Sequence, residues 1–260
     1  MSKANRIRRQ HAAAAPSPAA TLTVAIRRLG ARRLGLLAGA ILVAALVVGA
    51  AILLNGTGSS GPAAKLLGTS DAVALMRGVP QRGTSLGRGD APLTLRVYTE
   101  PQCPYCREWS ATTFPVVVDN FVRNGKLRVE FRGMAFVSGD SVRGLRTLFA
   151  LGAQNKLFEG ESLLYANQGT EGSGWLSAAF LRRLVAALPG IDTAKLARDI
   201  AGKTVAAEID KAGAQASAAG VNSTPTIFVG PTGGTLQRIA LTSYDPSVTI
   251  DAIKAAAGVR

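Results

Sequence analysis

The chain has 260 residues, 47% of them hydrophobic and 18% charged, so it is long and apolar enough to bury a core, which excludes a wholly disordered protein. Its 2 cysteines exclude a disulfide-rich miniprotein, and its single histidine, His11, leaves no residue set for a zinc site or a Ser-His-Asp hydrolase. The net charge of +14 is concentrated in residues 1–54, which contain no acidic side chain, so the remainder is only mildly basic and we expect no nucleic-acid partner.

The first predicted element is a membrane span. Residues Leu34 to Leu54 contain no charged or strongly polar side chain, and a helix of that length spans roughly 30 Å of hydrocarbon. Arginines stand at positions 27, 28, 32 and 33, whereas the next basic residue after the span is Lys65, and basic flanks tend to stay in the cytoplasm. We therefore predict a basic cytoplasmic tail over 1–33, an uncleaved single-pass transmembrane signal anchor over 34–54 in the cytoplasmic membrane, and an extracytoplasmic remainder. A cleaved signal peptide and a buried core helix are the alternatives.

Residues 55–77 are predicted to be a linker followed by a short helix. The sequence NGTGSSGPAA at 55–64 is rich in Gly, Ser and Pro and has no apolar periodicity, which is typical of a flexible tether. The helix is expected to begin after a cap at Ser70 or Asp71 and to end near Arg77 and Gly78. The segment that follows, up to Pro92, is predicted to be a loop with a short edge strand.

A strand, helix, strand unit comes next. Leu93 to Thr99 alternates apolar and polar residues and contains β-branched ones, which predicts a strand. Apolar residues then recur at helical spacing as far as Asn124, where Asn-Gly ends the helix, and Pro115 is expected to kink it. Leu127 to Met134 is the next predicted strand. The two strands are expected to be parallel with a right-handed connection.

The rest of the chain is predicted to be a helical block, a hairpin and a closing helix. The expected helices of the block cover residues 141–154, 156–167, 176–188 and 193–219, the last of them broken near Gly202. Thr226 to Val229 is predicted to be a buried strand that pairs with 236–241 as a hairpin, and residues 246–257 form the closing helix. This order of elements predicts an α/β fold.

Cys103 and Cys106 form a C-x-x-C at the first turn of the predicted helix. Residues three apart lie on one face of a helix, and the helix N-terminus offers free amides and a positive dipole end to a thiolate. This position lowers the pKa of the first cysteine, so Cys103 is predicted to be the attacking nucleophile and Cys106 the more buried resolving thiol. From the spacing alone, a structural disulfide, half of a metal site and a pair of inert buried thiols remain as alternatives.

Two segments carry a resemblance to a known family. YTEPQCPYCREW around the cysteines and VNSTPTIFVG at residues 221–230 together resemble the thioredoxin superfamily, and within it the DsbA-like thiol oxidoreductases. The resemblance implies a thioredoxin-like fold over 78–260 with a helical insertion at about 139–220. No cluster of polar side chains elsewhere in the sequence suggests a cofactor. The resemblance also implies a cis Pro225 that faces the cysteine pair, and a Thr224 backbone that pairs with a bound substrate strand. A trans proline that starts a strand is the alternative.

The dipeptide between the cysteines departs from the most oxidising members of that family. Pro104 and Tyr105 stand where those members have Pro-His, and we expect both to contact the substrate. Without the histidine, the thiolate of Cys103 is expected to be less stabilised and the disulfide less oxidising. Glu100 matches an acidic position of the family. It is a candidate for proton transfer to or from Cys106, or else a solvated charge at the end of the strand.

These features predict an exported, membrane-anchored thiol:disulfide oxidoreductase that donates a disulfide to exported proteins with free thiols. The resemblance implies a membrane-embedded, quinone-linked reoxidase of the DsbB or vitamin K epoxide reductase type as its partner. The alternatives are an extracytoplasmic reductase, for example one that serves cytochrome maturation, a metallochaperone, and a redox-inert binding module. A metallochaperone is disfavoured because copper sites of that class use a histidine, and the only histidine lies in the N-terminal tail.

Overall fold

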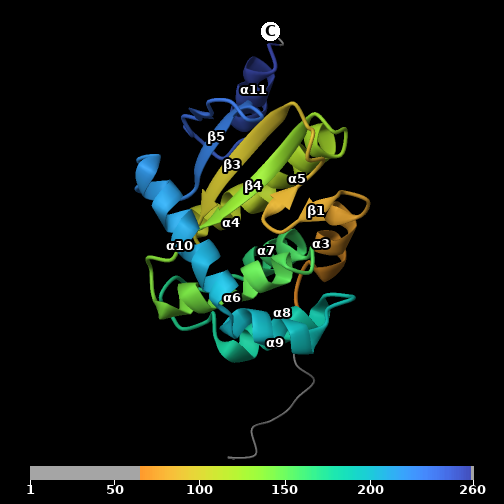
Figure 1. The fold of residues 1–260 in the computed structure, drawn as a ribbon, viewed down its shortest axis with the longest axis vertical. Coiled ribbons are helices and arrows are strands. Elements are labelled where there is room, and N and C mark those ends of the chain that lie inside the picture. The colour runs from red at the N-terminus through yellow and green to blue at the C-terminus, as the bar shows by residue number, and fades with distance from the viewer. Residues whose placement is uncertain (1–64, 259–260) are drawn as a thin grey trace, which may run out of the picture. The chain divides into compact units, whose positions relative to one another are not determined.

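The computed structural model describes residues 65–258 (Figure 1), and the predicted tail and membrane span lie outside this range. Within residues 65–258, no helix is both long enough and apolar enough to cross a membrane. The compact unit begins at Lys65, so the predicted short helix after the linker is part of it.

A six-stranded sheet organises the unit, with the strands in the order β1, β2, β4, β3, β5, β6. Its centre is β3 (Leu93–Thr99), which runs parallel to β4 (Leu127–Gly133) and antiparallel to β5 (Thr226–Pro231). The other strands are short: β1 (Gln81–Arg82), β2 (Ser85–Leu86) and β6 (Gln237–Arg238). Because β3 is central, its side chains are buried on both faces, and only Arg96 is half-exposed.

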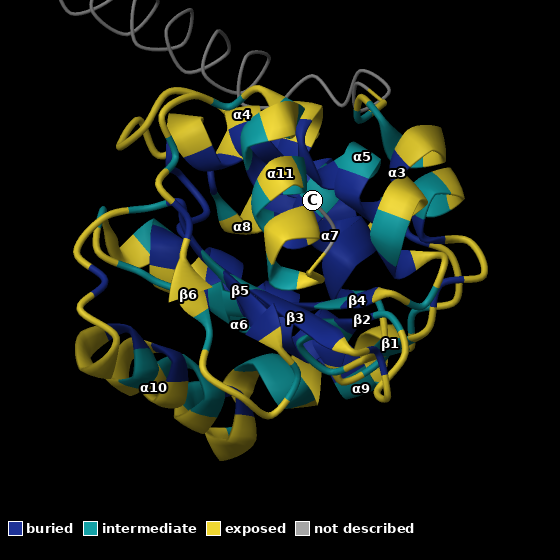
Figure 2. Cartoon of the chain, turned by 90° about the horizontal axis from the view of Figure 1, so that it is seen from above, coloured by how far each residue is buried: buried dark blue, intermediate teal, exposed yellow. Residues whose placement is uncertain are grey.

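Helices cover both faces of this sheet. Figure 2 shows α4, α5 and α11 on one side and α10 on the other, and Figure 1 shows α6 to α9 gathered beyond one end of the strands. The helices are α3 (Thr69–Met76), α4 (Pro104–Thr112), α5 (Phe114–Val117), the π-helix η2 (Val118–Val122), α6 (Gly139–Gly152), α7 (Leu157–Ala166), α8 (Ala178–Ala187), α9 (Thr193–Ala201), α10 (Lys203–Ala218) and α11 (Pro246–Ala256). One hydrophobic core runs through the sheet and the helical block. Phe114 of α5, for example, stacks on Phe158 of α7 with ring centroids 6.1 Å apart.

The helix after the cysteines is interrupted, as Pro115 predicts. α4 ends at Thr112, and Pro115 lies in the first turn of α5, where a helix has no need of its missing amide hydrogen. Thr113, at the junction, donates its hydroxyl to the carbonyl of Tyr244 at 2.9 Å. The interruption is therefore tied to the loop that precedes α11.

The start of α3 differs from the prediction. Gly68, with φ 72°, occupies the cap, so the expected cap at Ser70 or Asp71 is wrong. A glycine adopts this left-handed conformation without steric cost, and it starts the helix before either polar side chain. Asn167 at the end of α7 then accepts the amide of Leu67 and donates to its carbonyl, both at 2.9 Å, which holds α3 against α7.

The remaining predicted strands and helices are confirmed to within a few residues, except that β6 is shorter than expected.

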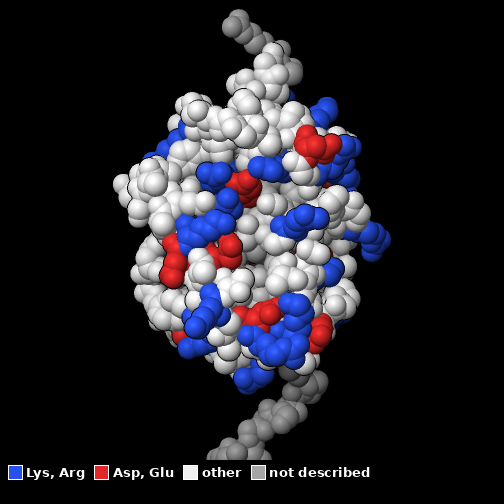
Figure 3. Space-filling view, viewed as in Figure 1, with Lys and Arg blue, Asp and Glu red and all other residues white. Residues whose placement is uncertain are grey.

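Charged side chains of both signs are interspersed on the face drawn in Figure 3. Glu130 of β4 shows how opposite charges are paired at the sheet. It is nearly buried, and a buried carboxylate needs partners, which it finds in three arginines at 2.9 Å each: Arg96, Arg128 and Arg132.

Candidate active site

Both cysteines lie where the central strand β3 turns into α4. Cys103 occupies the N-cap of α4, Pro104 is the first residue of the helix, and Cys106 lies in the first turn. The two thiols are free. Cys106 is the more buried, with 2% of its surface exposed against 7% for Cys103. Both thiols are therefore buried, and the helix start places Cys106 deeper in the core than Cys103.

The loop before β5 lies opposite Cys103. The peptide bond between Thr224 and Pro225 is cis. In its protonated form, the thiol of Cys103 donates to the carbonyl of Thr224, with sulfur and oxygen 3.3 Å apart. The hydroxyl of Thr224 is buried and has no hydrogen-bond partner among the described residues. Because β5 pairs directly with β3, the sheet itself brings this loop to the cysteines.

The pKa values of the two thiols are shifted in opposite directions. A hydrogen bond from the Cys106 thiol, helped by the amides at the helix start, lowers the pKa of Cys103 to about 6 although burial opposes the change. Burial, together with the nearby Cys103, raises the pKa of Cys106 well above its ordinary value. At neutral pH Cys103 is therefore a thiolate nucleophile and Cys106 a protonated thiol.

Glu100 is buried, so its interpretation as a solvated charge at the strand end is wrong. One carboxylate oxygen accepts the amide of Gln102 at 2.6 Å, and the other has no partner among the described residues. Burial raises the pKa of this carboxyl group. Its role in proton transfer to Cys106 stays a prediction.

Gln102, which the sequence analysis did not single out, anchors the active-site loop to the helical insertion. Its buried side-chain amide donates to the hydroxyls of Ser138 and Ser141, both at 2.8 Å. Its side-chain carbonyl oxygen accepts a hydrogen bond from the backbone amide of Gly172 at 3.2 Å. A polar residue directly before the first cysteine is visible in the sequence, but its partners lie 36 to 70 residues further on.

Gln168, just after α7, provides a second anchor that the sequence analysis missed. Its side-chain amide donates to the carbonyls of Pro101 and Cys103, both at 3.1 Å. These bonds hold the backbone on either side of Gln102. The turn that places the nucleophile is therefore fixed by side chains of the insertion.

The opposite side of the dithiol is open. Tyr105 is 59% exposed and stacks on Tyr244, with ring centroids 5.9 Å apart. A hollow of about 380 Å³ lies beside this pair and is lined by Thr224, Pro225 and Arg238 among others. The structure thus brings Tyr105, Thr224 and Pro225 to one hollow, and the buried Cys103 lies against the Thr224 carbonyl.

The sequence matches the thioredoxin family over residues 81–235, more than half of the chain. The chain belongs to the thioredoxin family. A probable disulfide bond formation protein D of Bacillus cereus is 27% identical over 150 residues, which cover 56% of this chain and 68% of that protein. The disulfide bond formation protein D of Bacillus subtilis is 23% identical over 151 residues, 55% of this chain and 66% of the relative.

Solved structures show the same fold for this thioredoxin-family chain. Oxidised BdbD of Bacillus subtilis superposes with a TM-score of 0.58 at 19% identity, over 67% of this chain and 92% of that one. DsbA of Chlamydia trachomatis gives a TM-score of 0.57 at 21% identity, over 67% and 91%. A dithiol with one thiolate at a helix start, on this fold and in this family, makes the chain a thiol-disulfide oxidoreductase.

Proposed function

We propose that this thioredoxin-family protein is an exported, membrane-anchored oxidase that donates its Cys103–Cys106 disulfide to exported proteins with free thiols. The observation that carries the proposal is the stabilised thiolate of Cys103, whose pKa is lowered to about 6. Stabilising the thiolate stabilises the reduced form and makes the disulfide a better oxidant. A pKa of this size lies between about 7 for thioredoxin and about 3.5 for DsbA, so we expect a potential between about −270 and −120 mV.

The arrangement supports disulfide donation in two steps. A substrate thiolate attacks the sulfur of Cys103, and Cys106 leaves. The second substrate thiol then attacks the substrate sulfur of the mixed disulfide and releases the Cys103 thiolate. Because its pKa is low, Cys103 is a good leaving group in this second step. The carbonyl of Thr224 and the exposed ring of Tyr105 lie where the substrate backbone and side chains arrive.

The proposed location follows from the sequence before the folded unit. The apolar segment 34–54 and its arginine-rich flank support a membrane anchor with the catalytic domain outside the cytoplasm, where disulfides persist. An anchor also raises the effective concentration of the domain near a membrane-embedded reoxidase of the DsbB or vitamin K epoxide reductase type. Relatives named as disulfide bond formation proteins support the same direction of transfer.

Trapping in intact cells identifies the substrates, and the redox state of the wild-type dithiol tests the direction of transfer. In Cys106→Ser the mixed disulfide has no internal thiol to resolve it, so exported proteins are expected to accumulate on Cys103. The matched control Cys103→Ser accumulates none. If the wild-type dithiol is mostly reduced in cells, and exported proteins acquire their disulfides normally without this chain, the protein is a reductase and the proposal fails.

Protease protection tests the location. Protease added to spheroplasts is expected to digest residues after 55 and to spare an epitope placed in the tail over 1–33. A catalytic domain that stays protected until the membrane is lysed would reject the export of the domain.

A further inference from the structure

The hollow of about 380 Å³ beside Tyr105 has one charged side chain in its lining. This is Arg238 of β6, and the other described residues of the lining are uncharged. Arg238 is exposed, and it belongs to none of the ion pairs found within residues 65–258. A positive charge that this part of the chain leaves unpaired therefore borders the hollow.

A buried threonine positions the guanidinium of Arg238. One terminal nitrogen of the guanidinium donates to the hydroxyl of Thr226 at 3.3 Å, and that hydroxyl donates in turn to the carbonyl of Ser223 at 2.7 Å. Arg238 also borders a second hollow along α11, but Thr226 lines only the hollow beside Tyr105. An arginine has five N–H donors, and the bond to Thr226 uses one of them. The guanidinium is therefore held at the hollow and keeps donors for a ligand.

The guanidinium lies two residues along the loop from the reacting sulfur. The sulfur of Cys103 is 3.3 Å from the carbonyl of Thr224, and Arg238 is bonded to the side chain of Thr226. An extended chain advances about 3.3 Å per residue, so no more than about 7 Å of backbone separates the two contacts. A substrate strand that pairs with this loop and brings its cysteine to Cys103 therefore places a side chain two positions from that cysteine near Arg238.

We propose that Arg238 is a specificity-determining residue that selects substrates with an acidic side chain two positions from the reacting cysteine. The planar guanidinium offers two parallel N–H donors to a carboxylate, which a lysine ammonium cannot do. A basic side chain at the same substrate position is repelled. The inference rests on the proposed function, because it names the class of protein on which the dithiol acts.

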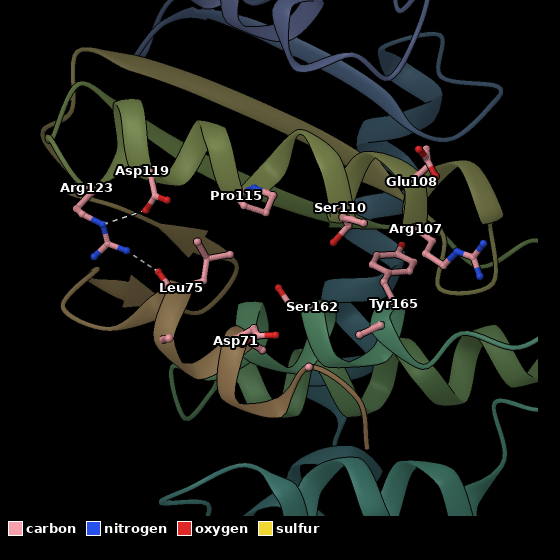
Figure 4. Close-up of a pocket in the computed structure, with 15 residues that line it drawn as sticks. Asp71, Leu75, Arg107, Glu108, Ser110, Pro115, Asp119, Arg123, Ser162 and Tyr165 are labelled. Carbon is pink, nitrogen blue, oxygen red and sulfur yellow. Dashed lines mark hydrogen bonds and ion pairs between the residues drawn. The ribbon is translucent and has the colours of Figure 1, made fainter. Parts of the chain in front are cut away.

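Charged residues next to the lining in the sequence belong to other parts of the surface. Asp245 caps α11, where its carboxylate accepts the amide of Ser247 at 2.8 Å. Arg107 and Glu108 of α4 line a separate groove of about 750 Å³ between α3, α4 and α7 (Figure 4). None of these three charges lines the hollow. Among the described residues, Arg238 is therefore the charged group placed to pair with a substrate carboxylate there.

The test measures the second-order rate constant with which the purified, oxidised full chain, in a non-ionic detergent, oxidises reduced synthetic peptides. Three peptides with two cysteines each differ only in the residue two places before and two places after each cysteine, which is Glu, Gln or Lys. The result then depends neither on which cysteine attacks nor on the direction in which the peptide lies. Ratios between peptides are compared between protein variants, because the intrinsic reactivity of the peptide thiols cancels in that comparison.

The ratio of the Glu peptide to the Gln peptide is expected to be roughly threefold to fivefold lower in Arg238→Gln than in wild type, as for an exposed ion pair. In Arg238→Glu, the ratio of the Glu peptide to the Lys peptide is expected to fall roughly tenfold or more below wild type, because attraction becomes repulsion. The wild-type preference is expected to shrink between about 50 and 500 mM NaCl, since salt screens exposed charges.

Arg82→Gln and Arg82→Glu are the matched controls. Arg82 is exposed on β1, at the opposite edge of the sheet, so these variants change the net charge equally without touching the hollow. Their ratios are expected to stay within about 1.5-fold of wild type. Wild-type ratios in the Arg238 variants, or equal losses in the Arg82 variants, would overturn selection by Arg238.

Failure of the proposed oxidase gives a different result from failure of this inference. A wild-type protein that oxidises none of the three peptides rejects the oxidase. The same ratios are then measured for reduction of the three peptides in their disulfide form by the reduced protein, and the same outcomes decide the role of Arg238. A protein that reacts with the peptides in neither direction rejects both proposals.

Discussion

The active-site loop has two dissimilar sides. On one side lies the proposed substrate-binding surface, here called the substrate wall, which consists of Tyr105, Thr224, Pro225 and Tyr244. On the other lies the insertion wall, which consists of Gln102, Ser141, Tyr165 and Gln168. The insertion wall is buried except for the half-buried Gln168, and its groups are bonded to one another or to the loop backbone. The substrate wall has one hydrogen bond to Cys103, an unpartnered hydroxyl on Thr224 and an exposed aromatic ring.

We infer from this difference that the insertion wall holds the loop in place and that the substrate wall receives a partner. A wall that satisfies its polar groups internally gains stability but has nothing left to offer a substrate backbone. A wall that leaves a hydroxyl free can bond to an arriving chain. Substitutions on the insertion wall are therefore expected to change stability first, and those on the substrate wall to change rates.

The largest effect is expected at Cys103, which stands between the walls. Cys103→Ser removes the attacked sulfur and is expected to lower peptide oxidation by roughly 10³-fold or more. Cys106→Ser keeps the nucleophile, so a reduced sample of this variant is expected to react once with an activated disulfide. A variant Cys103→Ser that still forms mixed disulfides through Cys106 would reverse the two roles.

A pH-dependent effect on stability is expected at Glu161, behind the insertion wall. Burial raises the pKa of this carboxyl group to about 8, whereas an unfolded chain titrates near about 4.3. As the pH rises between these values the unfolded state loses its proton first, so the free energy of unfolding falls. Glu161→Gln has no proton to lose and is expected to be more stable than wild type at pH 8, by on the order of 2–4 kcal/mol.

Urea unfolding at pH 4 and pH 8 checks this prediction, and the difference from wild type is expected to vanish at the lower pH. The exposed Glu171 offers a control. Glu171→Gln is expected to stay within about 0.5 kcal/mol at both pH values. A Glu161→Gln variant that loses stability equally at both pH values would contradict this prediction. It would show that the carboxyl group stabilises the fold through its own hydrogen bonds at both pH values.

The next effect tests whether the insertion wall holds the loop. Gln102→Leu removes the hydrogen bonds to the hydroxyls of Ser138 and Ser141 and to the amide of Gly172, and it is expected to cost about 2–3 kcal/mol in urea unfolding. Gln154→Leu is the control, because Gln154 bonds to the backbone of Asp192 near the surface. It is expected to cost under about 1 kcal/mol. Equal costs would remove the distinction between the walls.

The smallest effect is expected on the substrate wall. Tyr105→Ala removes an exposed ring that stacks on Tyr244, so its stability is expected to stay within about 1 kcal/mol of wild type. The KM for a peptide dithiol is expected to rise roughly threefold to tenfold with kcat nearly unchanged. A loss of stability without a change in KM would assign the Tyr105–Tyr244 pair to the fold and not to the substrate.

The elements around the site were predictable because local patterns determine them. Alternation marks β3, helical spacing marks the helix after the cysteines, and Pro115 marks its interruption. The dithiol is also local, since the spacing of Cys103 and Cys106 and their place at a helix start are visible in a dozen residues. These features depend on contacts within a turn or two of chain.

The insertion wall was not predictable because its contacts are distant in sequence. The hydroxyl of Tyr165 is hydrogen-bonded to Thr99, which lies 66 residues away in the sequence, and no periodicity predicts such a pair. The burial of Glu100 was not predictable for the same reason. A carboxylate at the end of a strand is usually solvated, and only the helices packed over it show that this one is buried.

The distance between the halves of the site also sets the order in which a new chain acquires them. Thr224 follows Cys103 by 121 residues, which a ribosome adds in roughly 6 to 24 s at about 5–20 residues per second. During that time α4 can form with its thiols, but β5 cannot yet pair with β3. A growing chain therefore carries both cysteines before it has the loop that lies opposite them. Synthesis of the helical insertion therefore separates in time the synthesis of the two cysteines from the completion of the active site.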